Sequence, residues 1–153
     1  MMDESDIDED KVKSQLKRAD HQIFVTLKYT RTVDIIKNII KRLILAFDFS
    51  IIEFLEHLKE KGLLKDEISL VPKARCEMLH KLFHDNIEIE DYVDFYLLLR
   101  NIDKSEFGKK DEYRKNVTLS TEFGDVTIDD IHRFYDKTKD FVKFTRDYIK
   151  DHP

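Results

Sequence analysis

The sequence predicts an all-α fold, a single bundle of about five helices with a small β-hairpin before the last helix. Only three glycines and two prolines interrupt the 153 residues, far below the ordinary usage of about 7% and 5%. Apolar residues recur at the helical period, as at Val33, Ile36, Ile40 and Leu43. The length suits one domain, which we expect over residues 11–153.

The first two predicted helices occupy the N-terminal half of the chain. The first runs from residue 11 or 19 to about 47, and its apolar stripe is so wide that we expect this helix at the centre of the bundle. The second is predicted to begin at Ser50, because Ser-Ile-Ile-Glu has the pattern of a capping box. It should end at Gly62, a residue that favours the position after a helix.

The C-terminal half contains three more predicted helices and the hairpin. Pro72 suits the first turn of a helix over residues 72–86, and acids near its start favour another over 88–107. Apolar residues alternate within 117–128 around a Gly-Asp turn, which predicts a β-hairpin. The last helix, over 129–150, carries an aromatic seam.

Charge divides the chain into blocks. The formal net charge is −5, but residues 1–10 hold six acids and no base, and residues 11–46 hold nine bases and two acids. We expect residues 1–10 to form an acidic disordered leader, because such a segment has little apolar surface to bury. Its composition is the opposite of a targeting leader, and the sequence holds no long uncharged apolar run that would cross a membrane. The protein is therefore expected in the cytoplasm without a membrane partner.

Two clusters of bases are candidates for nucleic-acid binding. Aromatic residues lie among the bases of the second cluster, and stacking together with positive charge suits single-stranded RNA. The alternative is that these charges only solvate helix faces. The candidate residues are Lys28, Arg31, Lys37, Lys41 and Arg42 in the first cluster, and Arg100, Lys104, Lys109, Lys110, Arg114 and Lys115, with Phe107 and Tyr113, in the second.

Arg75 and His80 form the one motif with a catalytic interpretation. The run Arg-Cys-Glu-Met-Leu-His over residues 75–80 resembles the R-x4-6-H motif of HEPN domains, small helical bundles of which many are metal-independent RNases. The long first helix, the short second and the last helix rich in Lys, Phe and Val are similar to that family. Lys28–Asp34 and the run 95–107 also resemble small archaeal proteins without an established activity. The HEPN resemblance implies that Arg75 would hold phosphate and that His80 would act on the 2′-hydroxyl or the leaving group.

The two motif residues do not converge on one helix. Residues five apart lie about 140° apart around the helix axis, so Arg75 and His80 would converge best across a dimer interface. The motif also differs from the family pattern, because Cys76 follows the arginine where a polar residue is common, and because its helix is the third of five. The alternative is a surface arginine and histidine beside apolar core positions.

Other reactive residues predict no further chemistry. Cys76 is the only cysteine, which excludes an internal disulfide and a multi-cysteine zinc site. Glu77, His80 and His84 have a spacing that metals use, but the sequence offers no second Glu-x-x-His for the remaining ligands, and no cofactor or metal is predicted. No glycine-rich phosphate loop occurs.

Two functional hypotheses follow. The first is a non-enzymatic, HEPN-like interaction module that binds RNA, or alternatively a protein partner, through the basic first helix. The second is a metal-independent endoribonuclease that uses Arg75 and His80. Part of the aromatic seam of the last helix is available for a second copy, so we expect a homodimer.

Overall fold

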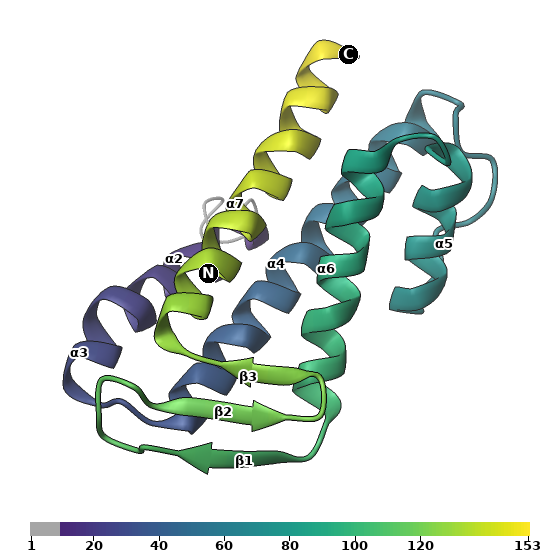
Figure 1. The fold of residues 1–153 in the computed structure, drawn as a ribbon. Coiled ribbons are helices and arrows are strands. Elements are labelled where there is room, and N and C mark those ends of the chain that lie inside the picture. Colours follow the sequence, from purple (N-terminus) through teal and green to yellow (C-terminus); the bar gives the residue numbers. More distant parts are fainter. Residues whose placement is uncertain (1–9) are drawn as a thin grey trace, which may run out of the picture.

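The computed structural model describes residues 10–153, so that residues 1–9 of the predicted leader lie outside the described residues. Of the described residues, 69% are helical, which confirms the predicted helical class. A three-stranded antiparallel sheet takes the place of the predicted hairpin. The sheet lies across one end of the helical bundle (Figure 1).

The N-terminal elements are α2 (Lys11–His21), the π-helix η1 (Gln22–Thr26), α3 (Leu27–Tyr29) and α4 (Val33–Glu60). They are followed by α5 (Pro72–Leu82), α6 (Ile87–Lys104), β1 (Phe107–Lys110), β2 (Thr118–Thr121), β3 (Gly124–Val126) and α7 (Ile128–Asp151).

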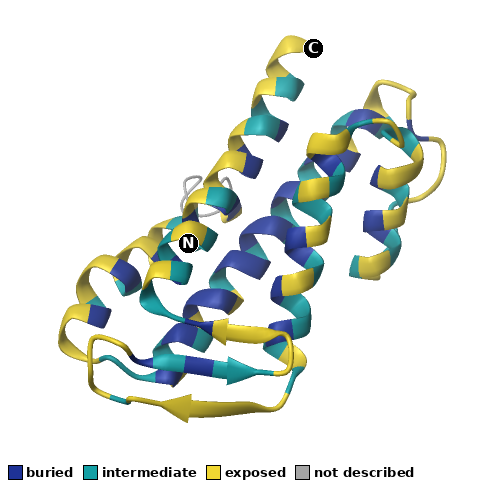
Figure 2. Cartoon of the chain, viewed as in Figure 1, coloured by how far each residue is buried: buried dark blue, intermediate teal, exposed yellow. Residues whose placement is uncertain are grey.

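Helix α4 is the centre of the bundle. Its buried positions follow the helical period from Val33 to Leu58, and the neighbouring helices cover them (Figure 2). The Phe47 ring stacks on Phe141 of α7, with ring centroids 4.7 Å apart, and also contacts Tyr96 of α6. Burying large aromatic side chains removes the most apolar area from water, and this contact joins α4, α6 and α7.

The prediction of two helices before Gly62 is wrong in its boundaries. The predicted first helix is broken at residues 30–32, where the Thr32 hydroxyl accepts a hydrogen bond from the Ile35 amide and caps α4. Helix α4 then continues through Ser50 to Glu60. Ser50 is buried, and its hydroxyl bonds to that of Thr145 at 3.0 Å instead of capping a helix.

Two other helix ends agree with the predicted signals, and a third has a cap that was not predicted. Gly62 follows the end of α4 with a φ of +78°, a backbone conformation that glycine adopts without steric cost. Pro72 occupies the first turn of α5. Thr127 and Asp130 form a reciprocal capping box at the start of α7.

The sheet contains one strand more than predicted. Strands β2 and β3 form the predicted hairpin, and Leu119 and Val126 bury their side chains beneath the helices. Strand β1 pairs antiparallel with β2, so that Phe107 lies opposite Thr121. The predicted fourth helix therefore ends at Lys104, before Phe107.

The aromatic seam of α7 packs within the same chain. Tyr148 lies edge-on to Phe54 of α4 and to Phe83, and Phe134 contacts Phe95 of α6. The homodimer expected through this seam stays a prediction. Within residues 10–153, no helix has the length and apolar character needed to cross a membrane.

Candidate nucleic-acid interface

Arg75 lies in the interior of the bundle. Its side chain is directed toward α4, the residue is 6% exposed, and Nη1 donates to the Ser69 carbonyl at 3.1 Å. Its Nη2 lies 3.7 Å from the Asp48 carboxylate, which also accepts a hydrogen bond from the Tyr96 hydroxyl. Burial, and then the bond to Asp48, hold the pKa of Tyr96 above its usual value. This group of side chains joins α4, α5 and α6.

His80 lies elsewhere on α5. Its ring is exposed, and Nδ1 lies 3.3 Å from the Glu90 carboxylate of α6. The chain therefore does not bring the Arg75 guanidinium and the His80 imidazole to one place where a phosphate would meet both. The catalytic role of this pair stays a prediction.

Cys76 is buried beside Arg75. Burial raises the pKa of the Cys76 thiol to about 11, and the thiolate is the nucleophilic form. The thiol is therefore protonated at neutral pH, and in that form it is a poor nucleophile.

Several of the predicted nucleic-acid residues are engaged within the fold. The Lys37 ammonium lies 4.0 Å above the centre of the Phe107 ring, and Lys41 lies 3.8 Å from Asp103. Arg42 donates to the Gln15 side chain of α2 at 3.4 Å. These three bases of α4 therefore do not form one continuous face toward solvent.

Several bases of the second predicted cluster are also engaged within the fold. The Arg100 guanidinium lies over the Tyr96 ring, with its carbon 5.7 Å from the ring centre. Lys110 lies 3.5 Å from Asp125, and Lys109 is close to both Asp34 and Glu112. Lys104 is exposed in the last turn of α6.

The structure brings two other parts of these clusters together. The segment between α3 and α4 meets the loop between β1 and β2, where the Tyr113 amide donates to the Arg31 carbonyl at 2.7 Å. Beside it, the Glu112 carboxylate accepts from the Val33 amide at 3.0 Å, at the start of α4. Both segments lie at the same corner of the molecule (Figure 1). These two bonds join the backbone segments that carry Arg31 and Tyr113.

The loop that presents Tyr113 is strained. Asp111 and Tyr113 have φ angles of 53° and 68°, in the left-handed region that side chains other than glycine adopt at a cost of about 1–3 kcal/mol each. The loop keeps this conformation because Asn116 donates to the Asp111 carboxylate and the Arg114 amide donates to the Asp111 carbonyl. Strain of this kind is concentrated at functional sites.

Two tyrosines and four bases gather on this corner, and we call them the basic–aromatic surface. Tyr29 is 84% exposed and Tyr113 is 74% exposed. Arg31 and Lys115 line one hollow. In residues 10–153, the side chains of the four bases make no ion pair with an acid. The surface consists of Lys28, Tyr29, Arg31, Tyr113, Arg114 and Lys115.

Acids close to this surface are mostly paired with other groups. Glu112 bonds to the Val33 amide and also lies 3.8 Å from Lys109, and Asp111 bonds to Asn116. Asp129 is exposed at the rim of the hollow that Arg31 and Lys115 line. Hydrogen bonds to neutral amides leave Asp111 and Glu112 charged, so this corner carries acids as well as the four bases, and none of these four bases forms an ion pair with them.

Tyr29 is the residue that sequence reasoning missed. The signal was its position in Lys28-Tyr29-Thr30-Arg31, where no apolar period explains an aromatic side chain. A large ring left in solvent beside bases is informative, because the fold of this chain gains nothing from its exposure.

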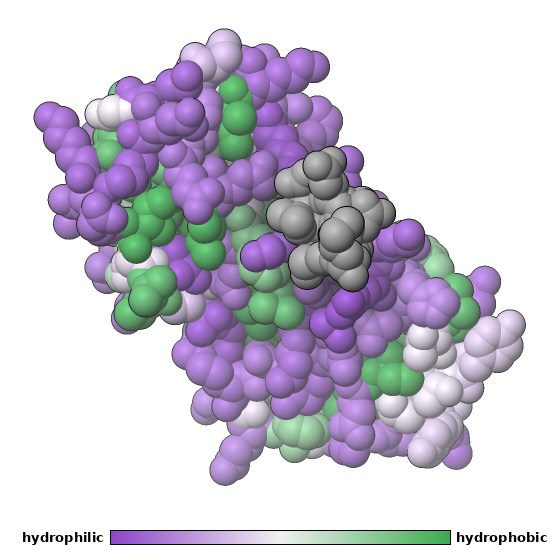
Figure 3. Space-filling view, turned by 180° about the vertical axis from the view of Figure 1, so that it is seen from behind, coloured by the Kyte–Doolittle hydropathy of each residue, from purple (hydrophilic) through white to green (hydrophobic). Residues whose placement is uncertain are grey.

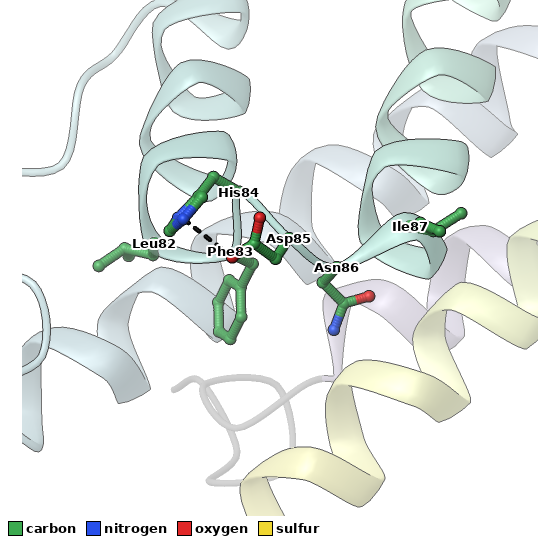
Figure 4. A pocket seen from close by; sticks show the side chains of 6 residues that line it. All are labelled: Leu82, Phe83, His84, Asp85, Asn86 and Ile87. Atoms are coloured by element: carbon green, nitrogen blue, oxygen red, sulfur yellow. Dashed lines mark ion pairs between the residues drawn. The ribbon is translucent and has the colours of Figure 1, made fainter.

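Another hollow lies at the turn between α5 and α6 (Figure 4). His84 and Asp85 face each other there, with Nε2 and Oδ2 3.0 Å apart, and Asn86 caps α6 by accepting from the Ile89 amide. Each of these polar groups has a partner within the turn. Among the described residues, no three His, Cys, Asp or Glu side chains are grouped so as to hold a metal ion.

Comparisons with family models, with curated proteins and with solved structures find no match to this chain.

Proposed function

We propose that this protein is a non-enzymatic module that binds single-stranded nucleic acid through the basic–aromatic surface. The observation that carries the proposal is the exposure of Tyr29 and Tyr113 beside four bases that, within residues 10–153, form no ion pair with an acid. The hydrogen bond from the Tyr113 amide to the Arg31 carbonyl joins the two segments that form this surface, residues 28–31 and 113–115.

The chemistry of the surface matches that of a single strand. An unpaired base offers a flat face that stacks on an aromatic ring, and alanine substitution of such rings costs about 1–3 kcal/mol per base. Lys28, Arg31, Arg114 and Lys115 supply cations for the phosphates on either side of the stacked bases. A duplex keeps its bases stacked on one another, so the two tyrosines favour an unpaired strand.

The test is the binding of fluorescein-labelled oligonucleotides, measured by fluorescence anisotropy at low salt. The probes are a mixed-sequence single-stranded RNA, the DNA of the same sequence and the matching RNA duplex. We expect the single strands to bind more tightly than the duplex. Replacing all four bases of the surface by glutamine should weaken single-strand binding at least tenfold, because each lost phosphate contact also removes counterion release.

A matched variant controls for the loss of charge. Lys13, Lys17, Lys61 and Lys150 are exposed and lie away from the surface, and replacing these four by glutamine changes the net charge by the same amount. Their replacement should leave affinity within about twofold. Equal losses in the two variants would overturn the proposal, and so would the absence of binding to any probe, which would favour a protein partner.

A further inference from the structure

Three large apolar side chains are exposed at the other end of the molecule. They are Leu63, Leu70 and Val71, which are 57%, 94% and 58% exposed and lie in or beside the connection from α4 to α5. Seen from behind, the molecule has apolar side chains gathered at this end and bordered by hydrophilic ones (Figure 3). An ordered leucine that stands almost wholly in water contributes nothing to the stability of its own chain.

Leu70 projects from a turn that is held in place. The Val71 amide donates to the Ser69 hydroxyl at 3.0 Å, and the buried Arg75 guanidinium donates to the Ser69 carbonyl at 3.1 Å. Pro72 then fixes the backbone in the first turn of α5. Because the backbone on both sides is already ordered, burying Leu70 in a partner would cost little conformational entropy.

A groove of about 380 Å³ lies between α5 and the segment that follows α4. Its wall is mainly aliphatic and is formed by Leu63, Leu64, Ala74, Met78 and Leu82. Leu63, one of the three exposed apolar side chains, also lines the groove, and Leu70 lies four residues before Ala74 of its wall. The chain thus presents an apolar projection and an apolar recess side by side.

The charges around the groove are balanced. Lys65 and Lys81 lie on its rim together with Asp66 and Glu77. A patch of a single sign would repel its own copy, whereas a patch with two charges of each sign can place unlike charges opposite each other across a twofold axis.

We propose that this patch is an isologous interface with a second copy of this chain. Leu70 of one copy fills the groove beside Met78 of the other, and the reverse contact forms at the same time. A twofold interface requires one patch that is complementary to itself, and the projection, the recess and the balanced charge meet this requirement together. The patch lies near the end of α4, and the basic–aromatic surface lies near its start, so the dimer leaves both nucleic-acid surfaces free.

Sedimentation equilibrium of the full chain over about 5–500 µM tests the proposal. We expect a reversible monomer–dimer equilibrium without larger species. Leu70→Asp should weaken dimerisation at least tenfold without changing the far-ultraviolet circular dichroism, because the side chain makes no contact in the monomer. Phe123→Asp places the same charge at an exposed aromatic of the β2–β3 turn and should leave dimerisation unchanged. A monomer at every concentration, or equal effects of the two substitutions, would overturn the proposal.

Cross-linking tests the register of the contact. Leu70→Cys and Met78→Cys are prepared separately in a Cys76→Ala background, with an affinity tag on one of them, mixed and mildly oxidised. We expect a disulfide between the tagged and untagged chains, in greater yield than between two copies of either variant. If the mixed product is not favoured, Leu70 does not enter the partner's groove and the proposed contact is wrong.

Discussion

Arg75 illustrates how one buried side chain positions several segments at once. Its guanidinium is shared between the Ser69 carbonyl before α5 and the Asp48 carboxylate of α4, and that carboxylate in turn accepts from Tyr96 of α6. A buried charge is tolerated when it is paired and hydrogen-bonded, and removing one partner leaves the other uncompensated. The arrangement therefore gives Arg75 a structural role that its position in the sequence motif does not reveal.

This role predicts different effects for the two residues of the motif. Arg75→Ala should lower the free energy of unfolding by about 2–4 kcal/mol, because Asp48 is left without its cation. His80→Ala should change that free energy by less than about 0.5 kcal/mol, as expected for an exposed side chain. Urea denaturation followed by circular dichroism measures both values.

His80→Ala also tests the endoribonuclease hypothesis. Purified protein is incubated with a mixed RNA pool in EDTA, beside His80→Ala. Cleavage that persists in EDTA and disappears in His80→Ala would contradict a purely non-enzymatic module. We expect no such cleavage, because the Arg75 guanidinium is buried and engaged by the Ser69 carbonyl and the Asp48 carboxylate, so that it does not face a phosphate in solvent.

Tyr113 combines strain with exposure, which predicts opposite effects on folding and binding. Tyr113→Gly removes the cost of a positive φ, while the exposed ring gives up little packing, so the free energy of unfolding should stay the same or rise by up to about 1 kcal/mol. Single-strand affinity should fall about fivefold or more with the loss of stacking. Urea denaturation and anisotropy on the same sample check the pair of effects, and a clear loss of stability would show that the ring is structural.

The helix ends show which parts of the fold can be predicted from local sequence signals and which cannot. Gly62 and Pro72 mark helix ends by their own chemistry, and these two ends were predicted. Ser50 had the pattern of a cap, but the apolar stripe of α4 continues in phase on both sides of it, and burial against Thr145 decides the outcome. A local sequence pattern around Ser50 cannot predict a hydrogen-bond partner as distant in the sequence as Thr145.

Neither strand β1 nor the basic–aromatic surface was predicted from the sequence, and the two reasons are related. All four residues of β1 are exposed, so no apolar alternation marks them, and the strand forms through its pairing with β2. The basic–aromatic surface depends on the hydrogen bond between Tyr113 and Arg31, which joins two loops that are distant in the sequence. The sequence identified Lys28, Arg31 and Arg114 as candidates but not their meeting place.

The start of α2 offers a pH-dependent test at the scale of an element. The Asp10 carboxylate accepts from the Lys13 amide as an N-cap and forms two bonds of 2.9 Å with the Arg146 guanidinium of α7. The bond to Arg146 lowers the pKa of Asp10 despite partial burial. A carboxyl whose pKa is lower in the folded state contributes stability above its unfolded value of about 3.9, and loses that contribution as the pH falls below it.

We therefore expect Asp10→Asn to cost about 0.5–1 kcal/mol at pH 7, since asparagine keeps the cap but not the charge and solvent screens this partly exposed pair. The difference from the parent protein should shrink at pH 3. Urea denaturation at the two pH values measures it, and a difference that is the same at both would contradict the assigned pKa shift.

At the scale of the whole molecule, α4 separates two surfaces of different chemistry. Its 28 residues span about 42 Å at 1.5 Å per residue, with the basic–aromatic surface near one end and the apolar patch near the other. A dimer formed through the patch therefore carries two independent nucleic-acid surfaces. The net charge of −5 does not show that bases gather at one end of the molecule, because it sums segments of opposite sign.

Stoichiometry tests this arrangement. Isothermal titration of the dimer with a short single strand should give one oligonucleotide per chain, and Leu70→Asp should give the same ratio and the same affinity per site. One oligonucleotide per dimer, or weaker binding by Leu70→Asp, would indicate that the two surfaces are coupled or shared.

The most direct test of single-strand binding is the replacement of the two exposed tyrosines while every charge is kept. Tyr29→Phe/Tyr113→Phe retains the rings, and Tyr29→Leu/Tyr113→Leu retains apolar bulk without an aromatic face. Anisotropy with the labelled single-stranded RNA should give an affinity within about twofold of the parent for the phenylalanine variant and a loss of at least tenfold for the leucine variant. Equal affinities of the two variants would contradict the account, because the surface would then bind by charge alone.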